Sequence, residues 1–206
     1  MITSDMNIFE KGLGRYINAE SLSRIANVTI GIAGCGGIGS NCAHNLVRCG
    51  FQHFVLVDPD CVEPSNLNRQ FYFTNQCGQP KVDMLKQNLL AINSNLLIKA
   101  IQTKITADNI ESIFYNCDAI VEAFDAVVSK KLLAEKYLHS NRVIVSVSGI
   151  AGSGNADDIV CKKVNHRFYM VGDFRSEVTE KVYPYSPKTN IAAAKQADII
   201  FHYFKQ

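Results

Sequence analysis

The stretch that decides the fold is GIAGCGGIGSN, residues 31–41. Gly34, Gly36 and Gly39 form a G-x-G-x-x-G pattern that comes directly after the apolar run 28–33. In such a pattern the first glycine permits a tight turn, and the second lets the backbone approach a phosphate at the positive end of the following helix. The stretch therefore predicts a strand, a phosphate-binding turn and a helix, and the turn suits either a dinucleotide or ATP.

The segments on either side alternate between apolar strand patterns and helical patterns. This alternation predicts an α/β fold with a Rossmann-like, doubly wound and mostly parallel sheet. A hairpin over 158–164 and 167–171 would add antiparallel strands near the C-terminus, and helices over 19–26 and 188–205 would flank the sheet. The repeating units are strands 28–33, 53–58, 96–102, 118–124 and 142–148, with helices 38–49, 80–92, 106–115 and 126–138.

The chain has 206 residues, which predicts one domain over 1–206 with an N-terminal helical segment at 1–26 and a mobile loop at 173–187. Hydrophobic residues make up 47% of the chain and charged residues 19%, as in soluble globular proteins. The net charge of +2 is too small to indicate a nucleic-acid surface, so we expect no nucleic-acid partner. Because no apolar segment approaches the ~18 residues of a membrane span, we expect a cytoplasmic protein without membrane contact.

The seven cysteines are an odd number and include no C-x-x-C pair. This pattern predicts free thiols rather than a disulfide framework, and it predicts no zinc site.

The second predicted strand ends in a carboxylate. Asp58 lies 19 residues beyond Gly39, at the place where a carboxylate accepts hydrogen bonds from ribose hydroxyls. A long polar segment, DCVEPSNLNRQFYFTNQCGQ at 60–79, follows before the helix that begins near Pro80. Loops of this length inside compact domains are usually functional. We therefore predict that this loop belongs to the nucleotide site.

The long loop and the start of the next helix supply two cations. An NAD pyrophosphate carries two charges, whereas a triphosphate carries about four and needs added cations, for which Arg69 and Lys81 are well placed. Asp125 ends another strand, where it serves either as the cap of the next helix or as a ligand of magnesium on a triphosphate. A carboxylate facing the phosphates would repel NAD. These residues together favour ATP with Mg²⁺.

The strings GCGGIGSN, LVDPDCVEPSNLNRQFY, GQPKV and VEAFDAVVSK resemble the ThiF/MoeB/HesA superfamily, which is related to the adenylation domain of ubiquitin-activating enzymes. The chain is most similar to the short ThiF-type proteins of thiamine biosynthesis. The resemblance implies an adenylyltransferase that uses ATP and Mg²⁺ to activate the C-terminal glycine carboxylate of a small, ThiS-like sulfur carrier ending in Gly-Gly. The product would be an acyl-adenylate of the carrier, and pyrophosphate would be released from ATP.

The resemblance also implies roles for individual residues. Arg15, in the string GRY, resembles an arginine that the family lends across a homodimer to the neighbouring ATP. Arg69, Lys81 and Asp125 would act in catalysis with it, and Asp125 would hold the magnesium. The residues implied in ATP binding are Gly34, Gly36, Gly37, Gly39, Asp58, Asp60, Asn66, Arg69, Gln70 and Lys81.

Other functions stay open at this point. An NAD(P)-dependent oxidoreductase would explain the glycine turn and Asp58 but would leave Arg69, Lys81 and Asp125 without a purpose. A non-catalytic subunit that binds a nucleotide or a ubiquitin-like protein is a second alternative. Within the superfamily, a molybdopterin-type carrier or a modified tRNA are also possible substrates in place of ThiS.

Overall fold

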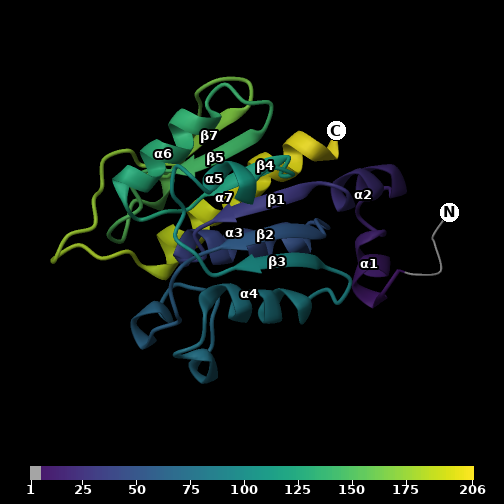
Figure 1. The fold of residues 1–206 in the computed structure, drawn as a ribbon, viewed down its shortest axis with the longest axis horizontal. Helices are drawn as coiled ribbons and strands as arrows, with labels where there is room; N and C mark the ends of the chain where they lie inside the picture. Colours follow the sequence, from purple (N-terminus) through teal and green to yellow (C-terminus); the bar gives the residue numbers. More distant parts are fainter. Residues whose placement is uncertain (1–5) are drawn as a thin grey trace.

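The computed structural model describes residues 6–206, which fold around a seven-stranded sheet (Figure 1). The strand order is β3-β2-β1-β4-β5-β7-β6, so the chain reverses its direction of winding between β1 and β4. This order confirms the predicted doubly wound fold. The strands are β1 (Thr29–Ala33), β2 (His53–Val57), β3 (Leu97–Ile101), β4 (Ala119–Glu122), β5 (Val143–Val147), β6 (Val160–Lys163) and β7 (Phe168–Gly172).

The predicted C-terminal hairpin is present, but one of its strands joins the parallel part of the sheet. β6 and β7 pair antiparallel, as predicted. However, β7 also inserts next to β5 and pairs with it in parallel. Only the edge strand β6 therefore runs against the other six strands.

Helices cover both faces of the sheet, and each face has its own hydrophobic cluster. On one face, Cys42 and Leu46 of α3 are fully buried in the same cluster as Ala193 of α7. On the other face, Phe114 and Leu133 cover β4 and β5. The helices are α1 (Ile8–Leu13), α2 (Ala19–Ala26), α3 (Gly37–Arg48), α4 (Lys81–Leu90), α5 (Ile110–Ile113), α6 (Val127–Tyr137) and α7 (Ser186–Lys205).

Two segments depart from the predicted elements. The predicted helix 106–115 is only four residues long, because the Asn109 side chain accepts a hydrogen bond from the Thr106 amide at 2.8 Å and closes a turn before the helix. The predicted helical segment 1–26 contains α1 and α2, and residues 1–5 of it lie outside the described residues.

The predicted loop before the last helix has no helix or strand over 173–185. It is tied to the chain that follows β5, since the Ser176 hydroxyl accepts the Ala151 amide at 2.9 Å and Pro184 forms a bridge with Gly152. Its mobility stays a prediction.

Candidate functional site

The glycine turn lies at the carboxyl ends of β1 and β2, where a doubly wound sheet binds its ligands. Gly34 has a φ of +98°, and its amide donates to the Val57 carbonyl at 2.9 Å. Gly39 packs so closely that a Cβ there would lie 1.8 Å from the Gly34 carbonyl oxygen. These contacts leave no room for a side chain, and they place the N-terminus of α3 at the edge of the sheet.

A cavity of about 360 Å³ opens in front of this turn. It reaches from β2 and β3 across to the β4–α6 connection, and it therefore lies over the switch point between β1 and β4. Its charged lining residues come from four separate segments of the chain. The residues that matter most here are Gly34, Gly36, Asp58, Asp60, Lys81, Lys104, Asp125 and Ser129.

Asp58 is held rigidly at the cavity wall. One carboxylate oxygen accepts the Cys35 amide at 2.7 Å and the other accepts the Asp60 amide at 2.9 Å. Burial raises the pKa of Asp58, while these two amides and the charge of Lys81 oppose the increase. The side chain is thus a preorganised acceptor at the predicted ribose position.

Lys81 and Asp60 form an ion pair inside the cavity, with 3.0 Å between Nζ and Oδ2. The Lys81 side chain is almost wholly buried, whereas that of Asp60 is mostly exposed. Lys81 is the first residue of α4, so the helix fixes its backbone beside the glycine turn. Its buried ammonium group is the cation best placed to meet an anion in the cavity.

The long loop packs against the glycine turn rather than extending into solvent. The Asn41 side chain donates to the Arg69 carbonyl at 2.8 Å, and the Ser40 hydroxyl accepts the Phe71 amide at 3.0 Å. The Tyr72 hydroxyl donates to the Cys35 carbonyl at 2.7 Å. The loop is therefore anchored to the first turns of α3.

Three predicted residues of this loop do not line the cavity. Asn66 is buried, and its side-chain oxygen accepts the Glu63 amide at 3.1 Å within the loop. The Arg69 guanidinium donates to the Ser65 carbonyl and the Asn68 side chain, although its Cγ lies next to Gly37. The buried Gln70 Oε1 has no hydrogen-bond partner among residues 6–206. The side-chain amide nitrogen of Gln70 lies beside Gly36 and is therefore close to the glycine turn.

Asp125 lies in the connection between β4 and α6 and is exposed at the cavity. The helix N-cap is Ala126, and no side chain caps the helix. The alternative that Asp125 serves as the helix cap is therefore wrong. Its carboxylate stays available to a ligand.

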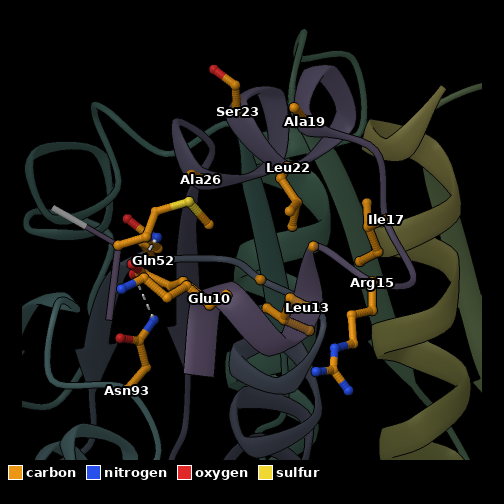
Figure 2. A pocket seen from close by; sticks show the side chains of 14 residues that line it. Glu10, Leu13, Arg15, Ile17, Ala19, Leu22, Ser23, Ala26, Gln52 and Asn93 are labelled. Carbon is orange, nitrogen blue, oxygen red and sulfur yellow. Dashed lines mark hydrogen bonds between the residues drawn. The ribbon is translucent and has the colours of Figure 1, made fainter. Parts of the chain in front are cut away.

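Arg15 lies far from these residues, at the opposite end of the sheet. It lines a separate cavity of about 600 Å³ between α1, α2 and the turn before β2 (Figure 2). Figure 2 shows Glu10, Gln52 and Asn93 together at one side of this cavity, with Arg15 beyond Leu13. The structure thus does not bring Arg15 to the glycine turn of its own chain.

Sequence reasoning missed Lys104, Ser129 and an ion pair behind the cavity wall, in which Glu122 is buried and Lys130 is half-buried. Lys104 follows the third predicted strand, and its position after that strand was an available signal. Glu122 ends an apolar strand pattern, which gives no signal of a paired carboxylate at that position.

Among residues 6–206, no three His, Cys, Asp or Glu side chains gather in a group that would hold a metal ion. Within the same range, no helix has both the length and the apolar character needed to cross a membrane.

Curated relatives match part of this chain. The tRNA threonylcarbamoyladenosine dehydratase of Bacillus subtilis is 34% identical over 137 residues, which are 66% of this chain and 54% of that protein. The adenylyltransferase and sulfurtransferase UBA4 of Eremothecium gossypii is 30% identical over 132 residues, which are 64% of this chain and 30% of that protein. The matched part of the chain thus spans about half of the first relative and less than a third of the second.

Solved structures share the fold. The E. coli tRNA N6-threonylcarbamoyladenosine dehydratase TcdA, in complex with ATP, matches with a TM-score of 0.85 at 19% identity, over 94% of this chain and 92% of that chain. E. coli MccB with AMPCPP and MccA matches with a TM-score of 0.67 at 22% identity, over 90% of this chain and 58% of that chain.

These relatives correct the expected substrate. The expectation of a ThiS-like sulfur carrier in thiamine biosynthesis is wrong, because both the Bacillus relative and the TcdA structure are dehydratases of a modified tRNA. The physical reason is that the motifs behind this expectation cluster around the cavity at the switch point, where we expect the nucleotide. Residues that hold the nucleotide do not by themselves specify the acceptor.

The family model described as "ThiF family" matches residues 11–201, nearly the whole chain. The matched region includes the glycine turn, the long loop and the β4–α6 connection. The chain therefore belongs to the ThiF family.

Proposed function

We propose that this protein uses ATP to adenylate a carboxylate, and that the carboxylate belongs to the threonylcarbamoyl group of a tRNA adenosine. The observation that carries the proposal is the cavity at the switch point, in which Lys81, Asp58 and Asp125 surround the glycine turn. The Bacillus relative and the protein in the TcdA structure are both dehydratases of threonylcarbamoyladenosine in tRNA, which supports this substrate. The proposed tRNA substrate replaces the expectation that nucleic acid is not a partner. Net charge averages over the whole surface, whereas phosphate contacts depend on local charge.

The charges in the cavity suit ATP better than NAD. Asp58 would accept the ribose hydroxyls, and the backbone at Gly34 and Gly36 would face the phosphates. Lys81 would neutralise part of a triphosphate, and Arg69 would join it by releasing its loop contacts. An NAD site needs neither the additional cations nor an exposed carboxylate such as Asp125.

Asp125 fits the magnesium that accompanies ATP. It is an exposed carboxylate at the cavity, and Mg²⁺ typically takes only one or two protein carboxylates together with phosphate oxygens and water. When bound, the ion would neutralise phosphate charge and hold the phosphates in place for attack. Asp125 would fix the position of that ion.

The reaction needs positioning more than proton transfer. A carboxylate is already ionised at pH 7, and its oxygen would attack the α-phosphorus while pyrophosphate leaves. The carbamoyl group of the same nucleoside would then attack the acyl carbon, the acyl C–O bond would break, AMP would leave and a proton would pass to solvent. The sum is loss of the elements of one water. The described residues that line the cavity include no cysteine or histidine, as this route requires none.

We also propose that Arg15 acts on the ATP of a second copy. Arg15 does not line the proposed ATP cavity of its own chain, and it is exposed at the amino-terminal end of the sheet. A homodimer would bring it to the partner's phosphates.

ATP binding is expected to weaken on acidification at a pH above the ordinary aspartate range. Because burial raises the pKa of Asp58, its carboxylate takes up a proton at a pH above about 3.9, the value of a free aspartate. A protonated Asp58 loses one acceptor for the ribose. Calorimetric titration from pH 7 downward measures this midpoint, with adenosine as the probe because the phosphates of ATP themselves take up protons in this range, and with circular dichroism to confirm the fold. A midpoint at or below that of free aspartate would contradict it.

The function is tested by incubating the protein with ATP, Mg²⁺ and tRNA that carries threonylcarbamoyladenosine. We expect the nucleoside to lose the mass of one water, with AMP and pyrophosphate formed in equal amounts. Unmodified tRNA should give neither product. If a ubiquitin-fold protein ending in Gly-Gly supported AMP formation and the modified tRNA did not, the proposed substrate would be wrong.

A further inference from the structure

A fully buried carboxylate stands directly behind the wall of the nucleotide cavity. Glu122 is the last residue of β4, and only 1% of its surface is exposed. Three residues further on is Asp125, the proposed magnesium ligand. Burying a carboxylate is costly unless hydrogen bonds and a counter-charge compensate it, so Glu122 calls for an explanation.

The Glu122 side chain holds the turn that carries Asp125. Its Oε1 accepts the Phe124 amide at 2.8 Å, which closes a short turn between Glu122 and Phe124, directly before Asp125. This turn also touches the phosphate-binding turn, since a Cβ on Gly34 would lie 2.7 Å from the Ala123 carbonyl oxygen. A shift of the turn would therefore be felt at both the metal ligand and the glycine turn.

Lys130, the fourth residue of α6, provides the counter-charge. Its Nζ lies 3.1 Å from Oε1 and 3.4 Å from Oε2 of Glu122, and it also donates to the Val147 carbonyl at 2.9 Å. The pair thus joins the ends of β4 and β5 to α6. The Gln196 side chain donates to the Glu122 and Val145 carbonyls from the opposite side.

We propose that Glu122 and Lys130 are positioning residues that hold the 123–126 turn in the geometry Asp125 needs to place Mg²⁺ on ATP. This inference rests on the proposed function. Neither side chain lines the cavity, so both act through the turn rather than on the substrate. Because charged hydrogen bonds are stronger than neutral ones, the ionised pair restricts the turn more than a neutral pair of similar size would.

The test compares Lys130→Met with Lys130→Arg, which keeps the charge. We expect Lys130→Met to reduce the tightening of ATP binding by Mg²⁺ about tenfold in calorimetry, and to accelerate hydrogen exchange of the Phe124 amide about tenfold. Lys130→Arg should stay close to wild type in both. Lys131→Met is the matched control, because Lys131 is the neighbouring residue and forms an ion pair with Glu135 at the surface, away from Glu122.

A second variant separates positioning from stability. Glu122→Gln combined with Lys130→Met removes both charges, which restores a balanced interior. Lys130→Met alone leaves the buried Glu122 carboxylate unpaired and should lower the melting temperature. We expect the double variant to regain the melting temperature of wild type, while Mg²⁺ still tightens its ATP binding only weakly. The positioning role would be overturned if the double variant regained both the wild-type melting temperature and the wild-type effect of Mg²⁺ on ATP binding. It would also be overturned if the variants no longer unfolded cooperatively, or if hydrogen exchange at Phe124 were unchanged in Lys130→Met. If wild-type protein failed to bind ATP, the proposed function would fail, and Phe124 exchange would still decide whether the pair fixes the turn.

Discussion

Replacing Asp125 by alanine is expected to lower ATP-dependent dehydration of the modified tRNA by about 100-fold, the typical effect of removing one charge-stabilising group. The fold should not change, because Asp125 is exposed and caps no helix. The free energy of unfolding should stay within about 0.5 kcal/mol of wild type, as for other surface substitutions. Product formation measured by nucleoside mass spectrometry, together with thermal unfolding, checks both expectations.

Asp108→Ala is the matched control for this change, since Asp108 is also exposed but does not line the cavity. It should retain wild-type activity. An Asp125→Ala variant that kept full activity would remove Asp125 from the metal site, whatever its stability.

Replacing Lys81 by methionine is expected to lower kcat/KM by about 100-fold or more and to weaken ATP binding, because a charge-assisted contact to phosphate is lost. The change also leaves Asp58 and Asp60 beside the phosphates without their nearest cation. Methionine has a similar length and fits the buried position. The folded state should survive, because Asp60 is mostly exposed and water can solvate its carboxylate.

Lys86→Met provides the control on the same helix, since Lys86 lies on α4 outside the cavity. Calorimetry with ATP and steady-state kinetics separate binding from turnover. ATP affinity that was equal in Lys81→Met and Lys86→Met would contradict a phosphate contact by Lys81.

Much of the fold followed from local patterns. The strands begin and end within two residues of the predicted ranges, because buried parallel strands are short apolar runs bounded by polar turns. The place of β7 between β5 and β6 was not predictable, since a hairpin pattern defines the pairing of its own strands but not which of them joins the sheet. The predicted helix 106–115 was too long because the Asn109 side chain competes for the first backbone amides.

The candidate site was only partly predictable. Asp58, Lys81 and Asp125 come from strand ends and a helix start, and the topology of a doubly wound sheet brings such ends together. The positions of Arg69 and Asn66 depend on contacts inside the long loop, which no periodic pattern describes. The acceptor was misjudged because the most specific motifs surround the nucleotide rather than the group that attacks it.

The central claim is that a substrate carboxylate attacks the α-phosphorus of ATP. It is tested most directly by labelling the carboxylate of the tRNA threonylcarbamoyl group with a heavy oxygen isotope and analysing the AMP that forms. We predict that each AMP carries one labelled oxygen in its phosphate, because the oxygen that attacks phosphorus leaves with AMP when the acyl C–O bond breaks. AMP without label, formed while the nucleoside still loses water, would contradict activation of the carboxylate.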